Sequence, residues 1–197
     1  PGNEKEIFSF DELINDFDLK KVQKKSAIWD SQKLNWISNQ HISLISSNKI
    51  LEHVRLLYPN WGISKDNTFN IKVIDLLKPR INNFKDLISQ AQSFYNDPKI
   101  YDKDDKLKAW PNSSVNVTIS DLRSALSQLY DWNEDIIENQ IKKFSKERDI
   151  PLKKIIMPLR YIIFGNLKGP SLFTSIALIG RKTIINRINL TLKNFKL

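Results

Sequence analysis

Apolar residues recur at three- and four-residue steps along most of the chain, which is the spacing of one face of an α-helix. The clearest case runs from Ser47 to Leu57, where Ile50, Leu51 and Val54 share that face. A further helix is expected to begin near Lys65 and to run on through Lys72 to Leu77. Four more sets of apolar residues show the same spacing: Phe84, Leu87, Ile88 and Ala91; Ile119, Leu122, Leu126 and Leu129; Ile136, Ile137, Ile141 and Phe144; and Ile184, Ile185, Ile188, Leu192 and Phe195. Only residues 112–117 approach the alternation of a strand, and they are too few to found a sheet. The pattern therefore predicts an all-α protein.

Polar residues mark the starts of several of these helices. Ser9 followed by Glu12 is a capping box, in which each side chain bonds the backbone N–H of the other residue. Further N-caps are expected at Asp30, Thr118 and Asn133. Helix starts are thus predicted in both halves of the chain.

Proline and glycine predict two sharp turns. Pro79 is expected to stop the preceding helix at Leu77 or Lys78, because proline disfavours helical geometry in the residue before it. Pro170 is expected to be the first residue of a helix that Gly180 ends.

Composition limits the class of protein. With 197 residues, 41% of them hydrophobic and 27% charged, the chain resembles an ordinary globular protein of one large or two small domains. Cysteine is absent and only His41 and His53 occur, which excludes a disulfide framework and argues against a zinc centre. No run approaches the roughly 18 apolar residues of a membrane span, and no signal peptide is recognisable. We expect a soluble, cytoplasmic protein.

Charge is distributed unevenly along the chain. The net charge is +9, and residues 150–197 contain nine Lys and Arg but no Asp or Glu, whereas residues 1–149 contain 22 of each sign. A surface of one sign is typical of proteins that bind a polyanion such as RNA. For any single cation, including Lys182, Arg187 and Lys193, a solvated helix face is the commoner interpretation.

Two blocks of sequence resemble bacterial glutamyl-tRNA synthetases. Near the C-terminus the chain reads Met157-Pro158-Leu159-Arg160-Tyr161-Ile162-Ile163-Phe164-Gly165, then Gly169-Pro170-Ser171-Leu172-Phe173 and Ala177-Leu178-Ile179-Gly180-Arg181. Near the N-terminus it reads Phe8-Ser9-Phe10-Asp11-Glu12-Leu13, Trp29-Asp30 and Lys33-Leu34-Asn35-Trp36-Ile37. Because these blocks lie at opposite ends, the resemblance covers nearly the whole chain.

The resemblance implies two consecutive helical bundles of the class I glutamyl-tRNA synthetase anticodon-binding type. Residues 1–45 would be the end of the helical stem-contact region, residues 46–99 the first anticodon-binding helical domain and residues 100–197 the second. Apolar spacing lapses near residue 100, where we place that boundary. Pro1 would be an excision point.

The family's His-Ile-Gly-His-like and Lys-Met-Ser-Lys-like motifs are absent, as are a glycine-rich phosphate loop and a Ser/His/Asp arrangement. We therefore expect no catalytic residue, no metal and no ATP or glutamate site in this fragment. The resemblance implies that the full-length enzyme attaches glutamate to tRNA with ATP and Mg.

The resemblance assigns Arg80, in Leu77-Lys78-Pro79-Arg80-Ile81, to the position that reads the third anticodon base. That base is cytosine in glutamate tRNAs and guanine in glutamine tRNAs. On its Watson–Crick edge cytosine presents neighbouring O2 and N3 acceptors that a guanidinium fork can bond together, whereas guanine presents N–H donors there. Pro79 should lift Arg80 out of the helix interior. A solvated arginine after a turn is the alternative.

The turn Lys168-Gly169-Pro170-Ser171-Leu172 is the second expected binding site. A helix that starts there leaves backbone N–H groups free for base oxygens or phosphate. In the family this turn meets the first two anticodon bases, so Gly169 and Pro170 would bring main chain close to a base and Leu172 would lie against one. Ordinary capping of an apolar helix is the alternative.

The resemblance also places Arg160 and Lys142 among the basic positions that line the anticodon cleft, with phosphate or base contact as their expected role. Solvated side chains are the alternative. Five tryptophans lie on or beside apolar faces and are expected to pack rather than to stack on bases: Trp29, Trp36, Trp61, Trp110 and Trp132.

The expected partner is tRNA, namely glutamate tRNA and possibly glutamine tRNA, bound by a monomer. Two other functions stay open: a free-standing helical RNA-binding adaptor, and a structural domain whose basic end binds another protein.

Overall fold

A computed structural model describes residues 5–22, 26 and 28–195. Pro1 lies outside them. The described residues form eleven α-helices and two short 3₁₀ turns, with no strand among them, which confirms the all-α prediction. The elements are α1 (Phe10–Asp16), η1 (Leu19–Lys21), α2 (Ser31–Leu44), α3 (Ser47–Leu57), α4 (Asn67–Leu77), η2 (Lys78–Arg80), α5 (Phe84–Tyr95), α6 (Lys103–Ala109), α7 (Ser114–Ser127), α8 (Glu134–Glu147), α9 (Leu152–Phe164), α10 (Leu172–Ile179) and α11 (Arg181–Asn194).

Side-chain caps start the helices at three of the predicted positions. Ser9 and Glu12 form the capping box of α1. Asp30 accepts a hydrogen bond from the Lys33 N–H at 2.9 Å, and Asn133 accepts one from the Ile136 N–H at 3.0 Å. These bonds satisfy backbone donors that the first helical turn leaves free.

One predicted start is wrong, at α7. Helix α7 begins at Ser114, and Thr118 lies inside it with its hydroxyl donating to the Ser114 carbonyl at 3.2 Å. The strand-like residues 112–117 are therefore mostly the first turn of a helix. Helix α4 begins at Asn67, close to the predicted start near Lys65.

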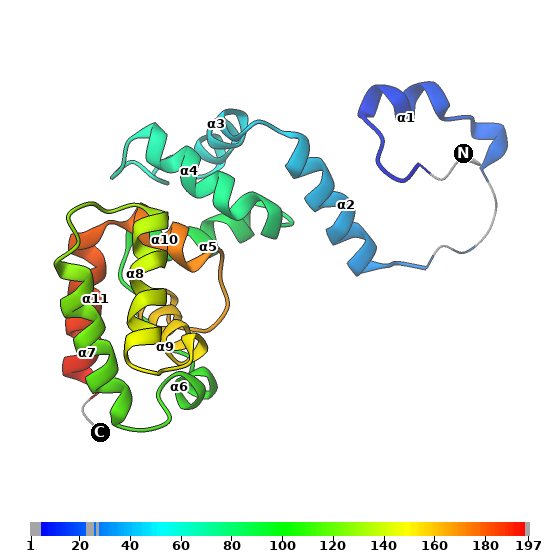
Figure 1. The fold of residues 1–197 in the computed structure, drawn as a ribbon. Coiled ribbons are helices and arrows are strands. Elements are labelled where there is room, and N and C mark those ends of the chain that lie inside the picture. Colours follow the sequence, from blue (N-terminus) through cyan, green and yellow to red (C-terminus); the bar gives the residue numbers. More distant parts are fainter. Residues whose placement is uncertain (1–4, 23–25, 27, 196–197) are drawn as a thin grey trace.

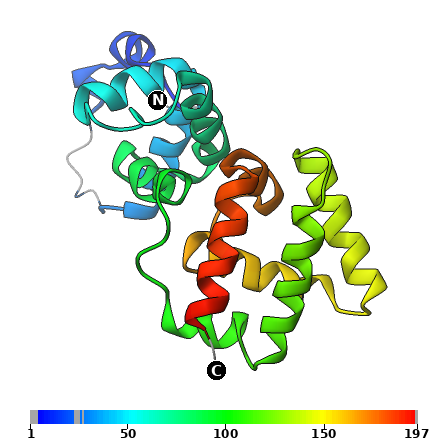
Figure 2. The ribbon, with the colours of Figure 1, turned by 90° about the vertical axis from the view of Figure 1, so that its left-hand side faces the viewer.

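The helices form two groups that meet at α10. Figure 1 shows α3, α4 and α5 above a bundle built from α7, α8, α9 and α11, with α10 where they join. Helix α10 contacts both α4 and α5 as well as α8. Figure 2 shows α11 running beside α7 along the bundle. Residues 96–102 connect the groups. The division of the chain into domains 46–99 and 100–197 stays a prediction.

A continuous apolar core lies inside both groups. Ile74, Leu77, Ile81 and Leu87 are fully buried in the first group, and the second group buries residues of α7, α8, α9, α10 and α11. Phe173 packs against this core. Burial of apolar surface is the main favourable term in folding, so this core holds the two groups together.

The tryptophans divide by position. Trp61 and Trp110 are buried, and Trp132 packs against the core, as predicted. Packing is the wrong prediction for Trp29 and Trp36, which are 76% and 43% exposed. Both lie in the N-terminal part of the chain, where α1 buries no residue and Figure 1 shows α1 far from the bundle.

Candidate nucleic-acid interface

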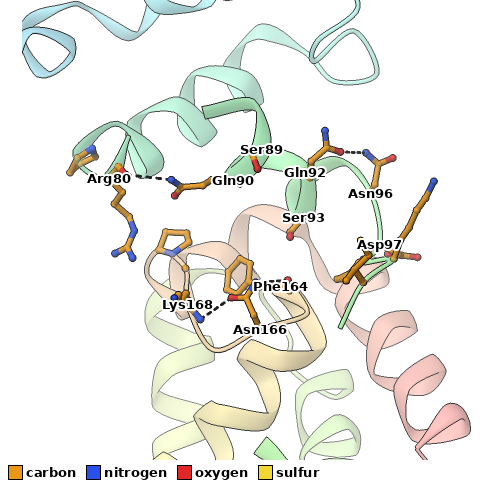
Figure 3. A pocket seen from close by; sticks show the side chains of 16 residues that line it. Arg80, Ser89, Gln90, Gln92, Ser93, Asn96, Asp97, Phe164, Asn166 and Lys168 are labelled. Carbon is orange, nitrogen blue, oxygen red and sulfur yellow. Dashed lines mark hydrogen bonds between the residues drawn. The ribbon is translucent and has the colours of Figure 1, made fainter. Parts of the chain in front are cut away.

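A groove with a volume of about 1060 Å³ separates the two helix groups. One wall is the turn at Arg80 together with α5, the opposite wall is the loop between α9 and α10, and the connector closes one end (Figure 3). The lining residues are Pro79, Arg80, Ser89, Gln90, Gln92, Ser93, Asn96, Asp97, Pro98, Lys99, Ile100, Phe164, Asn166, Lys168, Gly169 and Pro170. The structure thus brings together two regions that are almost 90 residues apart in the sequence.

The Arg80 turn forms because Pro79 ends the regular helix. Helix α4 stops at Leu77, as predicted, and η2 continues to Arg80 with the proline near its start. Three groups hold the turn from behind: the Asn39 amide donates to the Ile81 carbonyl at 2.8 Å, Lys78 Nζ donates to the Ile45 carbonyl, and the Gln90 amide donates to the Arg80 carbonyl at 3.3 Å. The Arg80 backbone is therefore fixed while its side chain is exposed.

The opposite wall is a tight loop after α9. Gly165 ends α9 with a φ of 74°, and Asn166 Oδ1 accepts the Lys168 N–H at 2.8 Å. Gly169 has a φ of 147°, and a Cβ built on it would lie 3.1 Å from the Phe164 ring. Glycine is required there because the loop lies directly on that ring in a backbone geometry that other residues rarely adopt.

Arg160 supports this loop from the side of α9. Its Nη1 donates to the Pro170 carbonyl at 3.0 Å. Burial lowers the pKa of Arg160, and the positive charge of Arg80 lowers it further. Arg160 is not among the residues that line the groove, and its contact with the loop is the bond to the Pro170 carbonyl.

Positive charge prevails in the groove. Arg80, Lys99 and Lys168 line it, and Asp97, the acid among its lining residues, is paired with Arg187 at 2.8 Å. Within the described residues, the guanidinium of Arg80 takes part in no ion pair or hydrogen bond, since its one bond is through the carbonyl. Figure 3 shows this side chain extending toward the loop that carries Lys168. Unpaired cations in a groove favour a negatively charged or acceptor-rich ligand.

Three predictions at this site are wrong. Pro170 precedes α10, which begins at Leu172 with Ser171 as its N-cap. Leu172 is 3% exposed because the first turn of α10 packs on the core, so it does not face the groove. Lys142 does not line the groove; its Nζ lies 2.6 Å from Glu138 Oε1 on the surface of α8.

Sequence reasoning missed several residues of the groove. Gln90, Ser93 and Asn96 lie on the polar side of α5 and the residue after it, and Lys99 follows in the connector. The polar stretch after Tyr95 could have indicated residues of the groove, because the regular apolar spacing stops there. Asn166 follows Gly165 directly and carries the turn chemistry of asparagine.

The described side chains include no group of three or more His, Asp or Glu placed to hold a metal ion. None of the described helices is long and apolar enough to span a bilayer. The groove presents hydrogen-bond donors, amide side chains, the main chain of two loops and positive charge. Such groups suit the recognition of single-stranded nucleic acid, where unstacked bases are read on their edges.

Comparison with known proteins assigns the class. Residues 49–192 match the family model described as "Anticodon binding domain". The chain belongs to this family, and its groove lies entirely within the matched residues.

Its relatives are glutamate–tRNA ligases. The chain is 27% identical over 198 residues to the glutamate–tRNA ligase of Chloroherpeton thalassium and 30% identical over 197 residues to that of Chlorobium phaeobacteroides strain BS1. Each match covers 95% of this chain and 39% of the relative. A crystal structure of a glutamate tRNA ligase from Elizabethkingia meningosepticum, in complex with its amino acid, superposes with a TM-score of 0.88 at 31% identity, covering 100% of this chain and 39% of that one. The predicted correspondence to the C-terminal, anticodon-binding region of such ligases is confirmed.

Proposed function

We propose that the groove binds the anticodon loop of a tRNA, with the third anticodon base against Arg80. The observation that carries the proposal is the unpaired, exposed guanidinium of Arg80 at the edge of a 1060 Å³ groove whose far wall is the loop Lys168 to Pro170. On the Watson–Crick edge, a guanidinium fork matches the O2 and N3 acceptors of cytosine and opposes the N–H donors of guanine. The first two bases would lie along the main chain at Gly169 and Pro170.

We further infer that the full-length protein is a glutamate–tRNA ligase of the cytoplasm that acts as a monomer and uses ATP and Mg. The support is that the curated relatives bear this name and that this chain spans 39% of their length. ATP and Mg would bind in the part of the enzyme that this chain does not include. Glutamate tRNA would be favoured over glutamine tRNA, since the two differ at the base assigned to Arg80.

The test is a binding titration with two anticodon stem-loop transcripts that differ only in having C or G at the third anticodon position. The wild-type chain should prefer C, and Arg80→Gln should reduce that preference by about 1–3 kcal/mol, because it removes the bidentate donor. Lys193→Gln, on the exposed end of α11, is the matched control and should weaken both transcripts equally. Equal loss for both transcripts in Arg80→Gln would contradict the role of Arg80.

Salt dependence and base preference together separate recognition of the tRNA anticodon from the two other functions. Affinity should fall with salt in proportion to the number of phosphates neutralised. A free-standing RNA adaptor would also show this fall but no preference for C. A protein-interaction domain would bind neither transcript even at low salt.

A further inference from the structure

Arg187 occupies an unusual place for a cation. It lies in the middle of α11 and is 3% exposed, so the expectation of a solvated side chain is wrong. Transferring a charged group out of water is costly unless it is paired and hydrogen-bonded. The partners of Arg187 therefore show which segments of the structure it holds together.

The guanidinium of Arg187 joins three segments. Its Nε donates to Asp97 Oδ1 at 2.8 Å, its Nη2 donates to the Asn96 carbonyl at 2.8 Å, and its Nη1 donates to the Ile163 carbonyl at 3.2 Å. Two acceptors belong to the start of the connector after α5, and the third belongs to the last turn of α9. Only the planar, multiply donating head of arginine can reach all three from one position.

These acceptors lie at both walls of the groove. Asn96 and Asp97 line it on the α5 side, and Ile163 directly precedes Phe164, which lines it on the other side. The loop at Gly169 lies against the Phe164 ring, and the centroid of that ring is 6.4 Å from the centroid of the Phe94 ring of α5. The position of the Lys168–Pro170 wall relative to the Arg80 wall thus depends on the place where Arg187 holds the connector.

The rest of the connector is already fixed to the second helix group. The Asp102 N–H donates to the Gly165 carbonyl at 2.8 Å, and the Leu167 N–H donates to Asp105 Oδ2 at 2.9 Å. The Ile100 carbonyl lies so close to Gly165 that a Cβ there would be 2.3 Å away. Arg187 extends this attachment to the residues that leave α5.

We propose that Arg187 is a positioning residue of the groove: it holds residues 96–97 against the end of α9 and so sets the spacing between the Arg80 wall and the Lys168–Pro170 wall. It touches no ligand itself. The spacing is a property of the chain alone, and its effect on base choice rests on the proposed function.

A pulsed EPR measurement tests the spacing without RNA. The chain has no cysteine, so Lys85→Cys on α5 and Lys146→Cys on α8, both exposed and both outside the groove, accept one spin label each. Asp97→Ala and Arg187→Lys should broaden or shift the distance distribution between the labels. Asp97→Asn keeps an acceptor at Oδ1 and should return most of the wild-type distribution. Asp121→Ala, which breaks the exposed ion pair between Arg148 and Asp121, is the matched control and should change nothing.

The same variants are then tested for the preference between C and G stem-loops. Asp97→Ala and Arg187→Lys should reduce that preference about threefold to tenfold. The ratio is the right readout, because removing the Asp97 charge alters phosphate attraction equally for both transcripts.

Asp97 is the decisive position, since its side chain is 57% exposed and its replacement creates no cavity. An unchanged distance distribution in Asp97→Ala and Arg187→Lys would overturn the proposal. Loss of the helical circular dichroism signal in Asp97→Ala would overturn it as well, because the contact would then be a condition of folding. If the wild-type chain binds neither transcript, the anticodon function fails while the distance measurement still decides the role of Arg187.

Discussion

Burial and partners determine what each arginine near the groove can bind. Arg187 uses its whole guanidinium on protein acceptors, Arg160 uses one of its nitrogens on the Pro170 carbonyl, and Arg80 keeps its fork free within the described structure. A free fork is what bidentate recognition of a base requires. At the scale of single residues, Arg80 is therefore the arginine to which we assign the proposed base selectivity.

Gly169 gives a prediction at the same scale. Gly169→Ala should destabilise the loop by about 1–3 kcal/mol, because alanine is strained at a φ of 147°. Its Cβ would also press on the Phe164 ring at 3.1 Å and displace the loop, so stem-loop affinity should fall. Chemical denaturation and the binding titration measure the two effects.

Gly180→Ala is the control for Gly169, since Gly180 has a φ of 92° and nothing within 4 Å of an added Cβ. It should cost stability through strain alone and leave RNA affinity unchanged. Wild-type affinity in Gly169→Ala would show that the loop is not part of the binding surface.

Tyr161 makes stability depend on alkaline pH. Burial raises its pKa from the ordinary value of 10.0 to about 12, and burial also raises the pKa of Tyr95 and Tyr101. A raised pKa means that the folded state keeps the proton longer, so the contribution to stability is complete below pH 10 and is lost as the pH rises toward 12. The melting temperature should therefore fall over that window.

Tyr161→Phe separates this titration from the rest of the protein. The variant loses the hydrogen bond from the Tyr161 hydroxyl to the Asp102 carbonyl at 3.0 Å, which should cost about 1 kcal/mol at neutral pH. Its melting temperature should nevertheless fall less steeply between pH 10 and 12. An equal slope in both proteins would show that Tyr161 ionises as freely in the folded state as in the unfolded one.

The resemblance pointed to Arg80, Lys168 and Gly169, each beside a turn that Pro79 or Pro170 marks in the sequence, and all three line the groove. Sequence reasoning could not separate Arg187 from the exposed cations of α11, because burial of that residue depends on Asn96 and Asp97, some 90 positions away. The role predicted for Leu172 is wrong for the same reason: its side chain is buried because α10 packs against helices that are distant in the sequence.

At the scale of elements, the capped helices are the most predictable part of the fold. Helices α1, α2 and α8 begin where Ser9, Asp30 and Asn133 indicated. Helix α7 was mistaken at its start because Val115 and Val117 alternate with polar residues and imitate a strand. Helix α6 was missed because it buries only Ala109 and so has no apolar face to recognise.

Asn133→Ala gives the prediction for these elements. The Asn133 side chain satisfies the Ile136 N–H at the start of α8, and its removal should cost about 1 kcal/mol of stability. Ser113→Ala is the matched control, because Ser113 is the N-cap of α7 but makes no capping bond with its side chain. Thermal denaturation should therefore show a lower melting temperature for the first variant and no change for the second. Equal shifts would mean that the cap of α8 contributes nothing.

At the scale of the whole molecule, the groove exists because two helix groups are held at a fixed separation. The resemblance to a synthetase predicted that Arg80 and the turn at Gly169 share a cleft, and both line one groove. The periodicity of the chain could not predict this, because it reports which face of a helix is buried and not which other helix covers it.

The N-terminal part of the chain differs from the rest in what it buries. Helix α1 and η1 contain no buried residue, and large apolar side chains from Phe10 to Trp29 are exposed. By contrast, α2 buries Ile42, and its Asn39 amide holds the carbonyl of Ile81 beside Arg80. The groove should therefore depend on α2 and not on the residues before it.

Two truncations of the chain test that difference. Removal of residues 1–28 should leave the melting temperature within about 2 °C of wild type, because α1 and η1 contain no buried residue and Asp30 still caps α2. Removal of residues 1–45 also deletes α2, so it exposes the surface that Ile42 covers and frees the turn at Arg80. The longer truncation should melt several degrees lower and lose preference for the C-containing stem-loop, whereas the shorter one should keep it. A wild-type preference after removal of α2 would show that Asn39 does not hold the Arg80 turn in its binding position.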